Sequence, residues 1–259
     1  MRERKEFIFS SGDQLLQPAS RRQFLKVLGV GGSIVMLPSV FTACEDNTII
    51  TPINPQTTYT LNLSNDVGIL NYAYALEQLE AAYYTAALTS TGFSQLSANE
   101  QEVIGDLQRH EVIHREFFKT VLGSAAIPTI NFNTTTVGSL TATRAVLLST
   151  SQLLEDTGVS AYNGAGKYLT DKNNLLVAGK IVSVEARHAA AIRDIRDTTG
   201  KLFAGDDVVS PSTGLDVKAE PGTVGASVNS LNVVMGSIAI GTAPDASKRT
   251  ADAPAPTPT

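Results

Sequence analysis

Hydrophobic residues recur at intervals of three and four positions in four separate stretches of the chain, which is the spacing of one face of an α-helix. The stretches predict helices over about residues 65–89, 98–122, 140–169 and 173–199. Ser97 and Glu100 form a capping-box pattern at the start of the second stretch, and Gly123 stands directly after it. The pattern therefore predicts an all-α protein built on four long helices.

The connections between these stretches favour a four-helix bundle. About three residues join the third to the fourth, which suits antiparallel neighbours that pack side by side. The second and third are joined by about seventeen residues, GSAAIPTINFNTTTVGS, which reach roughly 55 Å when extended. A helix of twenty-five residues is roughly 38 Å long. We therefore expect a long crossover between the second and third helices that runs the height of the bundle.

Each apolar stripe is interrupted at one level by acidic side chains. The first and third helices carry a single glutamate there, and the second and fourth carry a Glu-x-x-His pair. These residues are Glu77, Glu111, His114, Glu155, Glu185 and His188. Residues three apart share one face of a helix, so the bundle would bring four carboxylates and two imidazoles together in its core. Tyr84 lies seven residues after Glu77, and Tyr162 lies seven residues after Glu155. The two tyrosines are either hydrogen-bond donors that support the ligands or simple packing residues.

Charge explains why such a group would need a partner. Four buried carboxylates repel one another and would take up protons if left alone. Two divalent cations balance the four negative charges, and each ion can take one imidazole together with terminal and bridging carboxylates. Oxygen-rich ligands with one nitrogen per ion suit iron or manganese better than structural zinc or copper. The residues thus predict a site for two metal ions.

With these residues in place, the chain resembles the ferritin-like di-iron carboxylate superfamily, which includes bacterioferritin and rubrerythrin. The segments LNYAYALEQLEAAYY, HEVIHREFF and VEARHAAAIR resemble the bacterial ferritin-like-domain family that includes desiccation-related proteins, and the likeness covers about residues 65–200. It implies a ferritin-like four-helix bundle that holds two iron ions, with manganese as the other candidate. It also implies the ligands, which are Glu77, Glu111, His114, Glu155, Glu185 and His188.

Three residues near these ligands need a separate interpretation. Glu80 lies one turn from Glu77 and is the alternative ligand from the first helix, although the Glu/Tyr symmetry with the third helix favours Glu77. His110 is expected at the surface or behind the ligands. Arg193 belongs to a group of charged residues near the end of the fourth helix, which we expect to be solvated surface.

The resemblance implies an enzyme whose metal centre reacts with peroxide or oxygen, or with ferrous iron, in oxidative or desiccation stress. Rubrerythrins carry a four-cysteine rubredoxin centre, but this chain has one cysteine, so electrons must come from an external donor. The alternative is a non-catalytic metal-binding or stress-protective scaffold with the same fold. The sequence leaves open the substrate, the donor and the oligomeric state, a homo-oligomer included.

The N-terminal residues have the features of an export signal. SRRQFLK contains the pair Arg21-Arg22, an uncharged run VLGVGGSIVMLPSVFTA follows, and FTAC places small residues directly before Cys44. This resembles a twin-arginine signal joined to a lipobox. We expect residues 1–43 to be removed and Cys44 to carry a lipid, rather than to be an unpaired thiol in the fold. The protein would then be exported and anchored to a membrane of the cell envelope.

Composition and charge set the remaining limits. Apolar residues make up 42% of the chain and charged residues 17%, which is typical of a globular protein. Residues 1–43 hold six of the 20 basic and three of the 25 acidic residues, which leaves a net charge of −8 for residues 44–259. That acidity argues against a nucleic-acid partner. We expect a tether over 44–64, the bundle over 65–200, an irregular extension over 201–241 and a disordered tail over 242–259.

Overall fold

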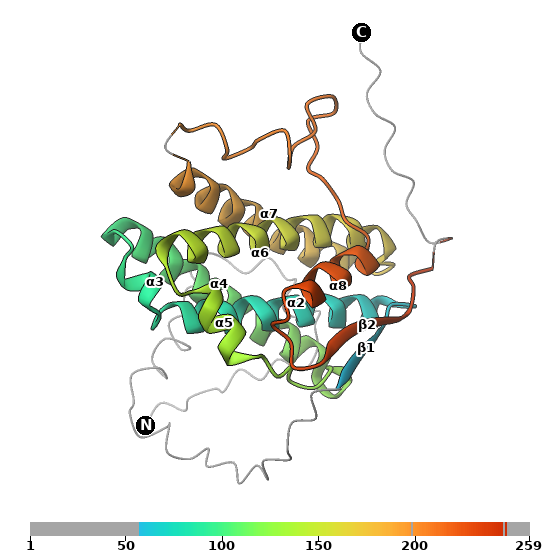
Figure 1. Cartoon of the computed structure of the whole chain (residues 1–259). Coiled ribbons are helices and arrows are strands. Elements are labelled where there is room, and N and C mark those ends of the chain that lie inside the picture. Colours follow the sequence, from blue (N-terminus) through green and yellow to red (C-terminus); the bar gives the residue numbers. More distant parts are fainter. Residues whose placement is uncertain (1–56, 198, 246, 248–259) are drawn as a thin grey trace, which may run out of the picture. The chain divides into compact units, whose positions relative to one another are not determined.

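The computed structural model describes residues 57–197, 199–245 and 247. The predicted export signal, Cys44 and the residues after Ser247 lie outside this range. Four long helices form the body of the described part (Figure 1). They are α2 (Asp66–Ala87), α4 (Ala98–Leu122), α6 (Arg144–Ala165) and α7 (Lys172–Arg196). Helix α2 packs mainly against α4, and α6 mainly against α7. The prediction of an all-α protein with four long helices is confirmed.

Each long helix begins at a polar side chain that caps its free N–H groups. The N-caps are Asn65, Ser97, Thr143 and Asp171. The predicted capping box is present, since the Ser97 N–H donates to Glu100 Oε2 over 2.8 Å and the Glu100 N–H donates to Ser97 Oγ over 3.4 Å. Helix α4 ends at Leu122, and the cap residue after it is Gly123, whose φ of 52° lies in the left-handed region that favours glycine.

The crossover between α4 and α6 is more structured than the sequence suggested. It contains a 3-10 turn, η3 (Gly123–Ala125), and a seven-residue helix, α5 (Thr134–Leu140). The side chain of Asn133 caps α5 by accepting bonds from the N–H groups of Thr135 and Thr136. The third long helix therefore begins at Arg144 rather than near residue 140, because Thr143 starts a new cap after α5 has ended.

Two strands join the ends of the described chain. Strand β1 (Thr58–Asn62) pairs in parallel with β2 (Ser237–Thr242) beside the bundle (Figure 1). Leu61 and Leu63 are each 1% exposed, so this segment packs into the core. The sequence placed residues 58–62 in a tether. They form a strand instead because apolar and polar residues alternate there, the period that buries one face of a strand.

The remaining elements are short. Helix α3 (Thr91–Ser94) lies between α2 and α4, and the 3-10 turn η4 (Gly166–Tyr168) follows α6. Helix α8 (Pro221–Ser230) lies against α6 and β2, within the segment expected to be irregular. Pro221 suits the first turn of α8, because a backbone N–H at that position would have no acceptor within the helix, so proline, which lacks the N–H, loses no hydrogen bond there.

A buried arginine ties the segment after α7 to the bundle. The Arg193 side chain is 2% exposed and makes five hydrogen bonds, one for each of its N–H donors. It donates to both oxygens of Asp156 on α6, to both oxygens of Asp207 and to the carbonyl of Leu202. The expectation of a solvated surface is therefore wrong for Arg193.

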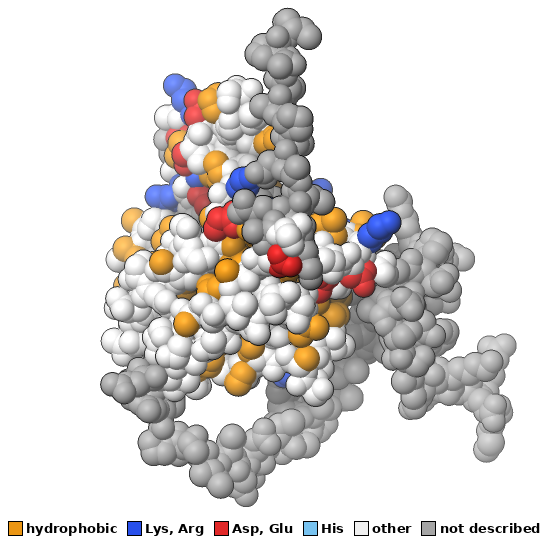
Figure 2. Space-filling view, turned by 90° about the vertical axis from the view of Figure 1, so that its right-hand side faces the viewer, with side chains coloured by type: hydrophobic (Ala, Val, Ile, Leu, Met, Phe, Trp, Pro, Cys, Tyr) orange, Lys and Arg blue, Asp and Glu red, His pale blue; other side chains and the backbone are white. Residues whose placement is uncertain are grey.

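Apolar side chains pack above and below the level at which the acidic residues lie. One group includes Leu70, Phe118 and Ile181, and a larger group includes Ile104 and Leu147. At the surface, hydrophobic side chains are scattered among polar atoms on the face that Figure 2 shows. Among the described residues, none of the helices combines the length and the apolar character that a membrane span requires.

Candidate metal centre

The six residues that the sequence singled out meet in the interior of the bundle. They are Glu77 of α2, Glu111 and His114 of α4, Glu155 of α6, and Glu185 and His188 of α7. All four glutamates are 0% exposed, so every one of their carboxylates has been removed from water. Burying a carboxylate without compensation costs several kcal/mol, which makes this level of the core unlike the apolar layers on either side.

The six side chains form two overlapping groups that could each hold a metal ion. In each group, one ligand atom per residue lies within 4.8 Å of the others. The first group is Glu77, Glu111, His114 and Glu185, and the second is Glu111, Glu155, Glu185 and His188. Glu111 and Glu185 belong to both, and each group has one histidine. This is the arrangement that two ions would need if two carboxylates bridged them and each ion took one imidazole.

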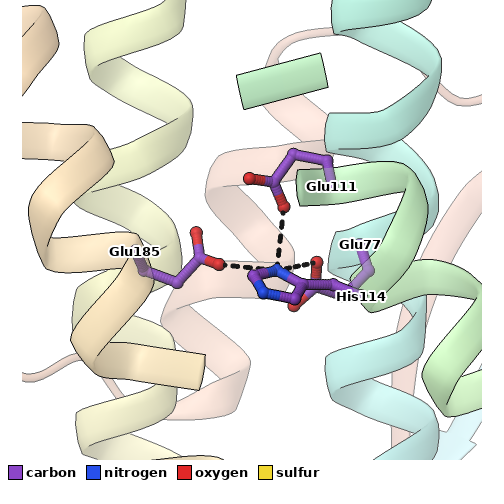
Figure 3. A group of neighbouring side chains, drawn as sticks. All are labelled: Glu77, Glu111, His114 and Glu185. Atoms are coloured by element: carbon purple, nitrogen blue, oxygen red, sulfur yellow. Dashed lines mark hydrogen bonds and ion pairs between the residues drawn. The ribbon is translucent and has the colours of Figure 1, made fainter. Parts of the chain in front are cut away.

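The histidines present the same ring nitrogen to the carboxylates. His114 Nδ1 lies 3.0 Å from Glu185 Oε1 and 3.3 Å from one oxygen each of Glu77 and Glu111 (Figure 3). His188 Nδ1 lies 2.8 Å from Glu111 Oε1 and 3.3 Å from Glu155 Oε2. Each Nδ1 atom therefore stands where a metal ligand would be needed, surrounded by carboxylate oxygens.

Several of these atoms make no hydrogen bond of good geometry, although His188 Nδ1 and Glu111 Oε1 lie 2.8 Å apart. Among the described residues, the buried side-chain atoms without such a partner include Glu77 Oε2, Glu111 Oε1, Glu155 Oε2, both Glu185 oxygens and His188 Nδ1. A buried polar atom left without a partner costs about 1–3 kcal/mol, and a charged one costs more. Six such atoms at one place in the core fit bound cations, one in each group of candidate ligands, which would take these atoms as ligands.

Two tyrosines hold the outer oxygens of the single glutamates. The Tyr84 hydroxyl on α2 donates to Glu155 Oε1 on α6 over 2.6 Å, and the Tyr162 hydroxyl on α6 donates to Glu77 Oε1 on α2. Each glutamate is thus fixed through one oxygen, while its other oxygen points to the centre. The sequence left the tyrosines open between donors and packing residues, and the structure identifies both as donors. Outer hydrogen bonds of this kind orient metal ligands.

Burial and neighbouring charges shift the pKa values of the cluster in opposite directions. Burial and nearby carboxylates raise the pKa of Glu185 well above its usual range and that of Glu77 to about 7. Burial opposes ionisation of Glu111 too, but the imidazoles of His114 and His188 close beside it outweigh burial and lower its pKa to about 2. Bonds to carboxylates likewise outweigh burial at the histidines and raise the pKa to about 12 for His114 and about 10 for His188. In the metal-free cluster, protons on the histidines and on glutamates such as Glu185 therefore offset the negative charge that metal ions would otherwise balance.

His110 contacts the cluster from outside. Its Nδ1 lies 2.9 Å from His188 Nε2, and the two rings are stacked with centroids 5.1 Å apart. His188 therefore uses one ring nitrogen towards the carboxylates and the other towards His110. The sequence expected His110 at the surface or behind the ligands, and the structure places it behind His188 with its outer part exposed. Its i, i+4 spacing from His114, which the sequence analysis did not use, is a signal that could have placed it on this side of α4.

Glu80 is also buried, at 3% exposed, but it belongs to neither group of candidate ligands. Glu77 is the glutamate of α2 that the structure brings to the histidines. Burial and the charges of Glu185, Glu111 and the other acids raise the pKa of Glu80 well above its usual range. The sequence treated the two glutamates as alternatives. Both point inward, because residues three apart share one helix face.

Comparison with known protein families adds one finding. The model of a family described as a ferritin-like domain matches residues 65–198, which is just over half of the 259 residues. The matched region contains all four long helices and all six candidate ligands. None of the curated proteins compared with the chain matches it.

Proposed function

The chain belongs to the ferritin-like domain family, and on this basis we propose that it binds two divalent ions, iron or manganese, between its four long helices. The observation that carries the proposal is the cluster of four fully buried carboxylates and two imidazoles, with six atoms that lack a hydrogen bond. Glu111 and Glu185 would bridge the ions. His114 would be the nitrogen ligand of one ion and His188 that of the other.

The donor set supports iron or manganese over other metals. It offers carboxylate oxygens and one imidazole nitrogen per ion and no thiolate, which suits these ions better than copper or structural zinc. Two divalent cations would also balance the charge of the four glutamates. Metal binding would displace the protons held by His114 and His188, because a nitrogen ligand must be deprotonated. Tyr84 and Tyr162 would keep Glu155 and Glu77 in place during this exchange.

We further propose that the loaded site reacts with peroxide or oxygen, or oxidises ferrous iron, under oxidative or desiccation stress. Iron or manganese held by these residues in its reduced state would supply electrons to a small oxidant. The chain contributes a buried setting for the four glutamates, two of which are fixed by tyrosine hydroxyls. With one cysteine in the whole sequence, it holds no cluster of thiolates to store electrons, so the donor is external.

Thermal unfolding of the metal-free protein, with and without ferrous or manganous ion, tests the site. A ligand at a hundred times its dissociation constant stabilises the fold by about 2.7 kcal/mol. His114→Ala and His188→Ala should each lose most of that stabilisation. The matched control is Arg187→Ala on the exposed side of α7, which should keep it. Metal analysis should give two ions per chain.

The outcomes separate the candidate functions. A stabilisation that depends on both histidines, together with peroxide or ferrous-iron turnover, supports the enzyme. The same stabilisation without turnover assigns the protein to the metal-binding scaffold instead. If neither ion shifts unfolding of the native sequence, the metal proposal is wrong.

We also propose that the protein is exported and anchored to a membrane of the cell envelope through a lipid on Cys44. The support is the Arg21-Arg22 pair and the FTAC segment that ends at Cys44. Cys44→Ser should release the protein into the soluble fraction or leave its signal uncleaved, as cell fractionation and mass measurement would show. A Cys44→Ser protein that stays membrane-bound with the same mass change as the native chain would refute the anchor.

A further inference from the structure

A pocket opens between α2, α6 and α8 and has a volume of about 160 Å³. Its rim includes the exposed residues Leu153, Ser227 and Ser230, and its floor includes the buried residues Leu76, Glu80 and Gly158. By this measure, which counts the space open to the centre of a water-sized sphere, a cavity needs roughly 10–15 Å³ to hold one water molecule. The pocket therefore has room for several small molecules and leads from the surface into the bundle.

Gly158 brings the floor of the pocket next to the candidate metal centre. A Cβ atom at this position would lie 3.2 Å from Glu80 Oε1 and 3.3 Å from Glu185 Oε2. The first oxygen belongs to the pocket, and the second belongs to a residue shared by both groups of candidate ligands. Because glycine has no side chain, nothing from position 158 fills the space between these two carboxyl groups.

The chemistry of the pocket selects its occupant. Leu76, Leu79, Leu154 and Val228 make most of the walls apolar, which does not suit a hydrated metal cation. Glu80 is the one titratable side chain of the lining, and among the described residues no hydrogen bond or ion pair to its carboxyl is found. Burial favours its neutral, protonated form, which can both donate and accept a hydrogen bond. A small neutral molecule with hydrogen-bonding atoms fits these walls and this carboxyl.

We propose that this α8 pocket binds hydrogen peroxide, a small neutral hydrogen-bonding oxidant, on the carboxyl of Glu80 and passes it over Gly158 to the metal centre. The second half of this inference rests on the proposed function of that centre. The first half, binding in the pocket, does not require metal. The two can therefore be tested separately.

Infrared difference spectra of the metal-free protein test the binding step. Addition of hydrogen peroxide should shift the carbonyl stretch of a protonated carboxyl group, and Glu80→Gln should remove that signal and so assign it. Ser227→Phe places a large side chain at the rim and should suppress the shift. Ala226→Phe, at the exposed neighbouring position that does not line the pocket, is the matched control and should preserve it. The binding step is refuted if no shift depends on Glu80 or if Ser227→Phe responds like Ala226→Phe.

Rapid mixing of the reduced, metal-loaded protein with hydrogen peroxide tests the passage. Ser227→Phe and Gly158→Ala should each slow oxidation of the centre roughly tenfold, about 1.4 kcal/mol in the barrier. Ala226→Phe and Gly179→Ala are the controls, because a Cβ atom at Gly179 meets nothing within 4 Å. Metal content and thermal stabilisation by metal should be the same in Ser227→Phe, Ala226→Phe and Gly179→Ala, and they are measured in Gly158→Ala as well, because its Cβ atom would lie 3.3 Å from Glu185 Oε2. If metal loads normally and all four variants react at the native rate, the pocket is not the route, and the proposed function stands without it.

Discussion

Glu155 and Asp156 are adjacent on α6, yet they belong to opposite kinds of buried charge. Asp156 accepts two hydrogen bonds from Arg193, which has a partner for each of its five N–H donors. Glu155 points into a cluster where four carboxylates face two imidazoles and six atoms lack a hydrogen bond. The Arg193 contact is complete with protein atoms alone. The cluster leaves six buried polar atoms without a hydrogen-bond partner from the protein. We take those unpaired atoms as the feature that distinguishes a binding site from a structural contact.

Arg193→Met should give the largest loss of stability in this comparison. It removes five hydrogen bonds that a buried cation donates, and charged hydrogen bonds contribute about 1.5–3 kcal/mol each in buried settings. Asp207 is mostly exposed and becomes hydrated, so we expect a total loss of about 2–3 kcal/mol rather than the sum. Denaturant unfolding of the metal-free protein measures it.

Arg187→Met is the control for that change, because its side chain is exposed and bonds only within α7. Stabilisation by metal should survive in Arg193→Met. If Arg193→Met unfolds like the control, the Arg193 contact does not hold the segment after α7, and the contrast with the cluster fails.

His110→Ala should have the next largest effect, and on metal binding rather than on folding. His188 would lose the partner of its Nε2 atom, so its ring would be less well oriented. Loss of such an outer contact weakens metal affinity roughly tenfold, or about 1.4 kcal/mol. Titration of the metal-free protein with manganous ion measures this change. Full retention of affinity would mean that His110 only stacks on the cluster, whereas His188→Ala should lose binding outright.

Glu185→Gln should change stability in the opposite direction from Arg193→Met. Burial and the neighbouring acids raise the pKa of the Glu185 carboxyl, so at neutral pH folding must add a proton to it, and a neutral amide of the same shape avoids that cost. Replacing buried charge by neutral groups is neutral or stabilising, and we expect a gain of about 1 kcal/mol in the metal-free protein. Stabilisation by metal should disappear, because Glu185 belongs to both groups. Glu116→Gln, at an exposed position of α4, is the control. A destabilised Glu185→Gln protein would show that the cluster is balanced without metal.

The sequence predicted the four helices and the inward acidic residues because both follow from local spacing. Periods of three and four fix which side chains share a helix face. A Glu-x-x-His pair lies within one helix, so it can be recognised without knowing which helices pack against it. The boundaries at Ser97 and Gly123 followed from local capping chemistry. For the same reason, the sequence placed all six candidate ligands at one level before their distances were known.

What the sequence missed depends on contacts between distant residues. Strand β1 pairs with β2, which places Thr58 opposite Ser237, and no pattern within either segment predicts that the two strands pair. Arg193 read as surface because its partner Asp207 lies in a segment without periodicity. The pocket beside Glu80 required α8, whose place on α6 is a tertiary contact. Glu80 itself was visible, but only the structure shows that it and Glu77 point inward to different neighbours.

The last effect concerns pH, and it distinguishes the cluster, whose histidines and Glu77 have raised pKa values, from the Arg193 contact. The raised pKa values of His188, about 10, and His114, about 12, mean that the metal-free fold binds protons more tightly than the unfolded chain. Their stabilisation is fully present below the ordinary histidine pKa of about 6.5 and is lost as pH rises through about 10 and 12. Glu77, with its pKa raised to about 7, adds a loss from the ordinary glutamate range up to that value.

Metal-free protein should therefore unfold more easily as pH rises from about 6 to about 8, because the unfolded chain loses its histidine protons in this range while the folded cluster keeps them, and Glu77 loses its proton near pH 7. Metal takes the place of those protons, so the loaded protein should lose less, and stabilisation by metal should grow with pH. Paired melting curves at each pH measure the difference. In Glu185→Gln, which lacks the site but keeps the Arg193 contact, the curves with and without metal should coincide at every pH. Metal stabilisation that stayed constant across this range would show that binding releases no protons, and His114 and His188 would then not be the atoms that exchange a proton for metal.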